Sequence, residues 1–324
     1  MNRSLKIIFL LIATAFLFVQ CYPTQVAKTS VSAQPKSAFR YYENALVAKF
    51  DGHWQEALKQ VNKAIALNDK ISLFFILKAQ IFDSLHQADS AIYAYQQALN
   101  IRPHAPDVLQ KIGELYIAKG ERQTGILYLK KAFAFDETQT DILLRIARLY
   151  LNVDSLRLAQ DVLSDYEVRM ELAHSPPKPS FYLMEGDMAY EKGDWALAAH
   201  YFKACPCKKC FSREQAVRAF DVFFKIRDYD AYFALLIGVD KQKFKNGTLF
   251  YYRGLYYKVI GNLSEAQHQF ELALKHGNTK PELFWELAQI YFQKNKTMQI
   301  KALYRKLQTI RPDSPYLKKM KALF

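Results

Sequence analysis

The chain has 324 residues, of which 51% are hydrophobic and 23% are charged. This composition is typical of a folded globular protein and excludes a wholly disordered chain. Gly and Pro, with 11 residues each, are too few for an all-β protein with many tight turns. The net charge of +14 would suit a protein that binds a polyanion such as nucleic acid.

Most of this positive charge lies at the two ends of the chain. Residues 1–42 contain five basic side chains and no acidic one, and residues 294–324 contain nine basic side chains and one acidic one. The 251 residues between them carry 31 basic and 30 acidic side chains. A nucleic-acid-binding helical repeat would carry its charge along the body, so we expect no nucleic acid as a partner.

The first 20 residues have the pattern of an export signal. Arg3 and Lys6 form a short basic region, and residues 7–19 form an apolar segment that is too short to span a bilayer comfortably. Cys21 follows this segment directly. Residues 22–37 are rich in Ser, Thr, Gln, Pro and Ala, which is typical of a flexible tether.

The segment resembles the signal of bacterial lipoproteins, in which the cysteine becomes the lipidated first residue of the mature chain. Phe18 and Gln20 stand where such signals usually have Leu and a small residue. The resemblance implies that Cys21 anchors the protein to a membrane of the bacterial cell envelope, facing the periplasm. An ordinary secretory signal, which would give a periplasmic or secreted protein, is the alternative.

The body of the chain is a repeated sequence unit. Segments that begin at Tyr42, Tyr182 and Phe250 each place Gly and Ala among spaced apolar residues, and aligning them on the Gly fixes a frame of 34 residues. The repeats of this frame start at Ala38, Ser72, Pro106, Thr140, Pro179, Arg213, Gly247 and Pro281, with a partial unit from Pro315.

Small residues recur at positions 8, 20 and 27 of this frame, and a large apolar residue recurs at position 24. This pattern is similar to that of the tetratricopeptide repeat family, a helix–turn–helix unit whose small residues let two helices approach closely. The resemblance implies an all-α, right-handed α–α solenoid of about eight repeats with a C-terminal capping helix. Position 8 is Ala45, Ala79, Gly113, Ala147, Gly186, Gly254 and Ala288, and position 24 is Val61, Tyr95, Leu129, Leu163, Phe202, Leu236, Phe270 and Tyr304.

Two places depart from the regular frame. In the sixth repeat, Phe220 and Tyr232 stand where small residues belong, so we expect its helices to pack at an altered angle. Prolines near residue 177 accompany a slip of five residues in the frame, which indicates either a bend between two halves or a simple long turn. The predicted segments are a signal peptide (1–20), a tether (21–37), repeats 1–4 (38–167), a connector (168–178), repeats 5–8 (179–314) and a capping helix (315–324).

The resemblance also implies where a partner would bind. In this family, positions 5, 9 and 12 of the first helix of each repeat line a concave face. Here that lining is mixed apolar and acidic in the middle and aromatic at the C-terminal end, which suits an extended peptide or helix of a protein partner. The alternative is that the terminal helix covers the aromatic end. The predicted groove residues are Tyr42, Leu46, Gln80, Glu114, Arg148, Asp187, Tyr190, Asp221, Tyr251, Trp285 and Phe292.

Three cysteines lie close together in the sequence CPCKKC. Cys205 takes position 27, where a small buried residue belongs, so we expect it in the core. Cys207 and Cys210 are candidates for a disulfide in an exported protein. With His200 they could also form a metal site, but their spacing matches no common ligand pattern, and we predict neither a metal nor a cofactor.

No catalytic motif is present in the sequence, which has no P-loop, no G-x-S-x-G and no H-E-x-x-H. The sequence therefore predicts a non-catalytic scaffold or adaptor that is anchored to the cell envelope. The alternatives are a redox or metal-binding solenoid that uses Cys205 to Cys210, and a nucleic-acid-binding helical repeat.

Overall fold

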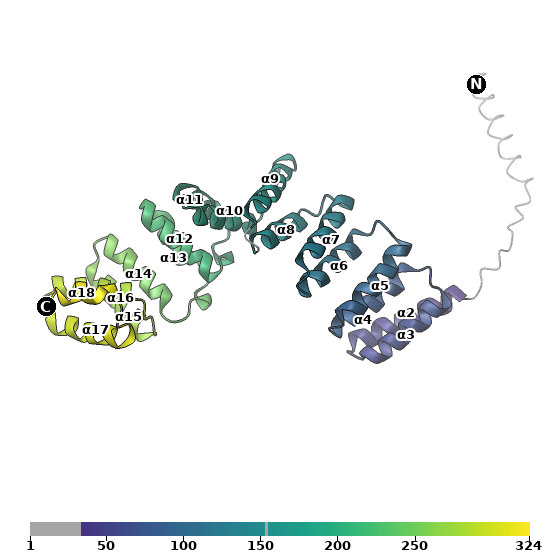
Figure 1. Ribbon diagram of the computed structural model, residues 1–324, viewed down its shortest axis with the longest axis horizontal. Coiled ribbons are helices and arrows are strands. Elements are labelled where there is room, and N and C mark those ends of the chain that lie inside the picture. Colours follow the sequence, from purple (N-terminus) through teal and green to yellow (C-terminus); the bar gives the residue numbers. More distant parts are fainter. Residues whose placement is uncertain (1–33, 153–154) are drawn as a thin grey trace, which may run out of the picture. The chain divides into compact units, whose positions relative to one another are not determined.

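The computed structural model describes residues 34–152 and 155–324, and all regular structure within these ranges is helical (Figure 1). None of the described helices combines the length and the apolar character that a membrane crossing requires. The predicted signal peptide, Cys21 and the tether up to residue 33 lie outside the described residues. The predicted tether extends to residue 37, but the first described helix already begins at Gln34.

The chain divides into two compact units, 1–135 and 136–324. The described part of the first unit consists of three helix pairs, which follow one another along the chain in Figure 1. Its helices are α2 (Gln34–Phe50), α3 (Trp54–Leu67), α4 (Ser72–Ser84), α5 (Ala88–Ile101), α6 (Pro106–Ala118) and α7 (Arg122–Phe135).

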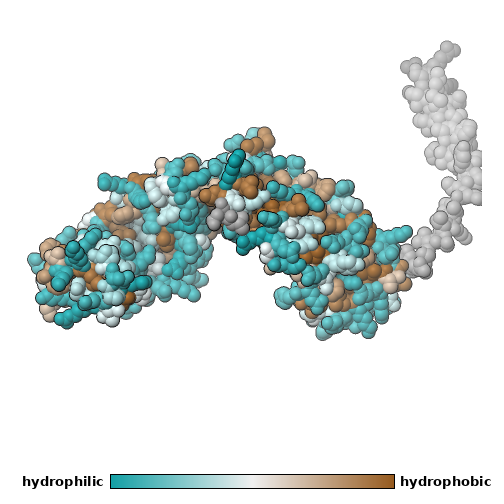
Figure 2. Space-filling model, viewed as in Figure 1, coloured by the Kyte–Doolittle hydropathy of each residue, from teal (hydrophilic) through white to brown (hydrophobic). Residues whose placement is uncertain are grey.

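The second unit contains five helix pairs, a terminal helix and two short 3-10 turns. On the face seen in Figure 2, hydrophobic patches interrupt a hydrophilic surface in both units. The helices of the second unit are α8 (Asp141–Leu151), α9 (Leu156–Leu172), α10 (Pro179–Glu191), α11 (Trp195–Ala204), α12 (Arg213–Ile226), α13 (Tyr229–Gly238), α14 (Thr248–Val259), α15 (Leu263–Lys275), α16 (Pro281–Gln293), α17 (Thr297–Ile310) and α18 (Pro315–Lys321), and the 3-10 turns are η1 (Lys208–Cys210) and η2 (Lys241–Lys243).

The helices keep the 34-residue frame of the sequence. From the second repeat to the eighth, the first helix of each pair begins within one residue of the expected start. Prolines occupy the first turn of α6, α10 and α16, where a missing N–H costs nothing because that group has no partner within the helix. Each repeat is therefore one pair of antiparallel helices, and the predicted all-α solenoid fold is confirmed.

The structure differs from the predicted segments around residues 168–178. Helix α9 continues to Leu172, so the loop before α10 is shorter than the expected connector. This loop does not interrupt packing, because the Tyr166 ring lies 5.5 Å from that of Phe181 and the Tyr166 hydroxyl accepts a hydrogen bond from the Lys178 N–H at 2.9 Å. The boundary between the compact units falls one repeat earlier, after Phe135.

Close approach of the two helices in a repeat depends on the small residue at position 8. An added Cβ on Gly186 would lie 2.5 Å from the ring of Phe202, and one on Gly254 would lie 2.4 Å from the ring of Phe270. Both phenylalanines are at position 24 and are fully buried. Glycine at position 8 therefore makes room for a phenylalanine at position 24 of the same repeat.

The sixth repeat replaces the small residues with a cluster of rings. Phe220 and Tyr232 are both buried, with ring centroids 5.1 Å apart. Phe220 also stacks on Tyr252 of the next repeat at 4.6 Å, and the Tyr232 hydroxyl donates a hydrogen bond to the Tyr252 carbonyl at 2.8 Å. Aromatic packing thus joins repeats 6 and 7, where other repeats rely on small residues.

We predict that Gly186→Ala destabilises the second unit. Overpacking against Phe202 lowers the free energy of unfolding by about 1–3 kcal/mol, whereas the better helix propensity of Ala raises it by about 1 kcal/mol. We therefore expect a net decrease in the free energy of unfolding. Hydrogen exchange of amides in α10 and α11 measures this loss locally. Adding Phe202→Leu to Gly186→Ala should restore part of the lost protection, whereas increased protection in the single variant would contradict the packing described here.

Candidate functional site

A regular set of side-chain contacts joins the first helices of neighbouring repeats. Lys49 donates a hydrogen bond to Gln80, Arg218 donates one to Asp187, and Lys258 donates one to Gln289, at 2.5, 2.9 and 2.8 Å. The Tyr252 hydroxyl makes a longer contact of 3.5 Å with Asp221. In all four pairs the two residues are 31 positions apart.

This separation equals the length of one repeat minus about one turn of helix. A residue at position 9 or 12 therefore meets the residue three positions earlier in the next repeat. The contacts occur on the face that positions 5, 9 and 12 were predicted to line, and they bring several of the predicted groove residues into one row. The partners at position 6, such as Arg218 and Tyr252, were not predicted, although the 31-residue spacing could have identified them.

The larger of two hollows along this row has a volume of about 1110 Å³ and is lined from α8, α10 and α12. Asp187 on α10 accepts hydrogen bonds from Gln215 and Arg218, and Arg218 also pairs with Glu191 at 2.7 Å. Burial raises the pKa of the Asp187 carboxyl, although these hydrogen bonds act in the opposite direction. Predicted groove residue Arg148 lines the same hollow.

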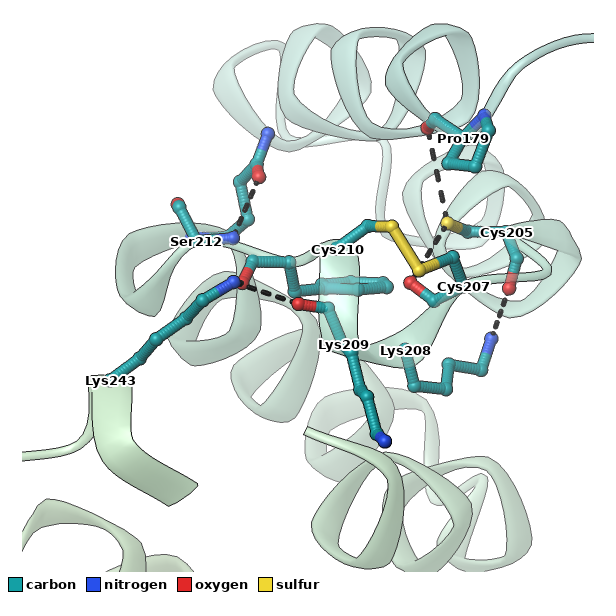
Figure 3. Close-up of a disulfide and its surroundings, with 10 residues drawn as sticks. Pro179, Cys205, Cys207, Lys208, Lys209, Cys210, Ser212 and Lys243 are labelled. Carbon is teal, nitrogen blue, oxygen red and sulfur yellow. Dashed lines mark hydrogen bonds between the residues drawn. A yellow bond between two sulfur atoms is a disulfide. The ribbon is translucent and has the colours of Figure 1, made fainter. Parts of the chain in front are cut away.

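The cysteine-containing turn, shown in Figure 3, lies beside this larger hollow. Cys207 and Cys210 form a disulfide, and Cys210 lines the hollow. Cys205 is buried and keeps a free thiol, whose pKa is raised by burial. A raised pKa leaves less thiolate, so this thiol is a poor nucleophile towards the neighbouring disulfide.

Two lysines fasten this turn to its surroundings. The Lys208 ammonium donates hydrogen bonds to the carbonyls of Phe202 and Cys205 at the end of α11, at 3.2 and 2.7 Å. The Lys243 ammonium reaches back to the carbonyls of Lys209 and Phe211, at 2.7 and 3.1 Å. These hydrogen bonds fix the position of the turn, which directly precedes α12. Within the described residues, no group of three His, Cys, Asp or Glu side chains is placed to hold a metal ion.

The second hollow, which we call the aromatic hollow, has a volume of about 370 Å³ and lies among repeats 5–8 and the terminal helix. Rings form most of its wall, and the rest is made of Leu255, three carboxylates and one lysine. The rings are those of Tyr190, Trp195, Phe220, Phe224, Tyr232, Tyr251, Tyr252 and Tyr316, and the charged residues are Asp221, Lys225, Glu282 and Glu286.

Asp221 is one of the three carboxylates that line the aromatic hollow. Its side chain is exposed to the hollow, yet the surrounding protein removes enough water to raise the pKa of its carboxyl. Lys280, Tyr252 and Lys225 counteract this effect only in part. Asp221 is thus a carboxylate that is accessible and incompletely compensated.

In the first unit the predicted groove residues make contacts of their own. Tyr42 packs on Phe74 with ring centroids 5.4 Å apart, and Leu46 is exposed. Gln80 accepts the hydrogen bond from Lys49, and Glu114 pairs with Lys111 at 2.9 Å.

No protein-family model matches the chain. Among curated proteins it is similar to the photosystem I assembly proteins Ycf3 of Cyanophora paradoxa, with 33% identity over 28% of this chain, and of Prochlorococcus marinus subsp. pastoris, with 34% identity over 30% of this chain. The chain spans only 55% and 61% of the length of these two relatives.

Among solved structures, the chain is similar to a tetratricopeptide repeat protein from Parabacteroides merdae, with 14% sequence identity and a TM-score of 0.49. This match covers 78% of this chain and 98% of that chain. A repeat protein from Cytophaga hutchinsonii matches with 14% identity over 86% of this chain and 98% of that chain, with a TM-score of 0.47.

The packing of this chain repeats one pattern, in which pairs of helices recur about every 34 residues with small residues at position 8 against large ones at position 24. This is the helical-repeat architecture that the resemblance to tetratricopeptide repeats implied. Solenoids of stacked repeats present an extended face along their length. The aromatic and the larger hollow are both lined by first helices of repeats 4–8.

At the C-terminal end of the predicted groove, the terminal helix covers part of the surface. Tyr316 of α18 stacks on Trp285 with centroids 6.3 Å apart, and the Lys319 ammonium lies 5.9 Å from the Trp285 ring. Tyr251 is buried in the wall of the aromatic hollow, whereas Phe292 is 51% exposed. Trp285 is therefore partly covered by the cap, while Phe292 stays open.

We predict that Asp221→Asn stabilises the protein at neutral pH. The raised pKa of Asp221 means that its ionised form is unfavourable in the folded protein, and Asn has a similar shape without the charge. The melting temperatures of the wild-type protein and the variant should converge as pH falls through the raised pKa of Asp221, because its carboxyl then becomes neutral, as the Asn side chain always is. A variant that is less stable at pH 7 would show that Asp221 is a satisfied structural carboxylate.

Proposed function

We propose that this protein is a non-catalytic scaffold of the bacterial cell envelope that binds a segment of a protein partner in the groove of repeats 5–8. The observation that carries the proposal is the row of accessible aromatic and charged side chains on the first helices of these repeats. Phe224 at the edge of the aromatic hollow is 38% exposed, so a segment bound in the hollow would cover its ring.

The sequence relatives support an assembly role in particular. Both are named as photosystem I assembly proteins. We infer that the present chain is of the assembly or secretion factor type. Its partner is a protein of the envelope, and no nucleic acid is involved.

The N-terminal sequence supports tethering. A lipidated Cys21 followed by a polar tether would keep the repeats near a membrane surface, facing the periplasm. Anchoring raises the effective concentration of the groove for partners in the same membrane, so that even a weak groove contact would capture them.

The groove proposal predicts that Phe224→Ala reduces partner capture. Loss of a ring at the edge of a binding hollow costs about 1–2 kcal/mol of binding, or roughly tenfold in affinity. Affinity isolation from cells that carry the variant, with quantitative mass spectrometry, measures this loss. The matched control is Phe233→Ala, because Phe233 is similarly exposed, at 42%, but does not line the hollow. Equal recovery of partners by both variants would contradict the groove.

The tethering proposal predicts that Cys21→Ser releases the protein from membranes. Without the thiol no lipid can be attached, and no described helix would replace the anchor. Fractionation of cells into membrane and soluble material should move most of the protein to the soluble fraction. A variant that stays with the membranes would show that lipidation at Cys21 is not what anchors the chain.

A further inference from the structure

We propose that the aromatic hollow binds a cationic side chain, arginine above all, of the partner segment, with Asp221 as its counter-ion. The inference rests on the proposed function and adds the chemistry of the bound segment. The hollow, at about 370 Å³, is at the small end of the range for ligand pockets, so it suits one long side chain rather than a folded element.

The same face already holds two of the protein's own cations in this way. The Arg218 guanidinium lies 5.4 Å from the centre of the Tyr190 ring while it pairs with Asp187 and Glu191. The Lys225 ammonium lies 3.5 Å from the centre of the Trp195 ring. Rings and carboxylates of this groove therefore form sites that stabilise a positive charge.

Comparison of equivalent repeat positions shows what the aromatic hollow lacks. Asp187 and Asp221 both occupy position 9, and each meets position 6 of the following repeat. For Asp187 that residue is Arg218, whose guanidinium pairs with the carboxylate. For Asp221 it is Tyr252, which offers only a long contact through its hydroxyl. An incoming guanidinium would give Asp221 the charge partner that Asp187 has within the chain.

Two further carboxylates line the hollow from the first helix of repeat 8. Glu282 on α16 is exposed, and among the described residues no ion pair to it is present. Glu286 pairs with Lys258, so its charge is partly neutralised. A cation in the hollow would thus have the carboxylates of Asp221 and Glu282 and several rings in the surrounding wall.

Two lysines compete with such a ligand. Lys225 lines the hollow, and Lys280 lies 5.6 Å from the rings of both Tyr251 and Tyr252. Both act on Asp221 electrostatically. Removing the positive charge of Lys225 should therefore favour the incoming cation.

The test uses the full-length protein in detergent and two peptides that carry fluorescein on the N-terminal amine, fluorescein-Gly-Ala-Arg-Ala-Gly-amide and the same peptide with citrulline in place of arginine. Citrulline keeps the shape of arginine but has no charge. Fluorescence anisotropy should show that the arginine peptide binds about tenfold more tightly than the citrulline peptide. Asp221→Asn should abolish most of this difference, Glu282→Gln should reduce it, and Lys225→Met should tighten arginine binding about threefold.

Asp230→Asn is the matched control, because Asp230 belongs to the same repeat but does not line the hollow, and it should leave both affinities unchanged. Circular dichroism melts confirm that each variant is folded. Equal binding of the two peptides, binding of neither, or an arginine preference that survives both Asp221→Asn and Glu282→Gln would overturn the inference. None of these results would affect partner capture through Phe224, which tests the groove separately.

Discussion

The structure depends on how closely the two helices of each repeat approach one another. Gly113 and Gly125 show the limit, because a Cβ added to either would lie within 3 Å of the other's backbone oxygen. With a small residue at position 8, a large side chain at position 24 can fill the space between the helices, as Phe202 and Phe270 do. This packing rule repeats along the chain, with the ring cluster of the sixth repeat as the exception, and fixes the orientation of the first helix relative to its partner in the repeats that follow it.

The row of contacts between first helices follows from that arrangement. When each repeat places its first helix beside the next one, residues 31 positions apart come into contact, and within each compact unit these contacts form a row along positions 6, 9 and 12. The row is not uniform, because the residue at position 6 of the next repeat decides whether a carboxylate is paired. Arg218 neutralises Asp187, whereas Tyr252 leaves Asp221 available. A change of one residue type at one repeat position thus turns a structural ion pair into a candidate binding site.

The frame of 34 residues could be predicted from the sequence because its small and large positions are local and recur many times. The places of Asp187 and Tyr190 on the face that lines the two hollows could be predicted for the same reason. The contribution of Trp195 could not, because it begins the second helix of its repeat and lines the hollow beside Tyr190 and Lys225. The covering of Trp285 by α18 was the alternative that the sequence left open, and the repeat positions could not decide it because they do not encode where α18 packs. The division after Phe135 could not be predicted, because the prolines near residue 177 are the stronger sequence signal for a boundary. In the structure, Tyr166 and Lys178 hold that loop within one compact unit.

Site-specific photo-crosslinking in living cells tests most directly whether a partner occupies the groove of repeats 5–8. A benzophenone amino acid can replace Phe224 at the edge of the aromatic hollow, or Phe233 on α13 outside it, because both side chains are partly exposed and leave room for the larger group. Irradiation should produce a discrete crosslinked species from position 224 and none from position 233. Crosslinks from position 233 alone, or the same species from both positions, would contradict binding in the groove.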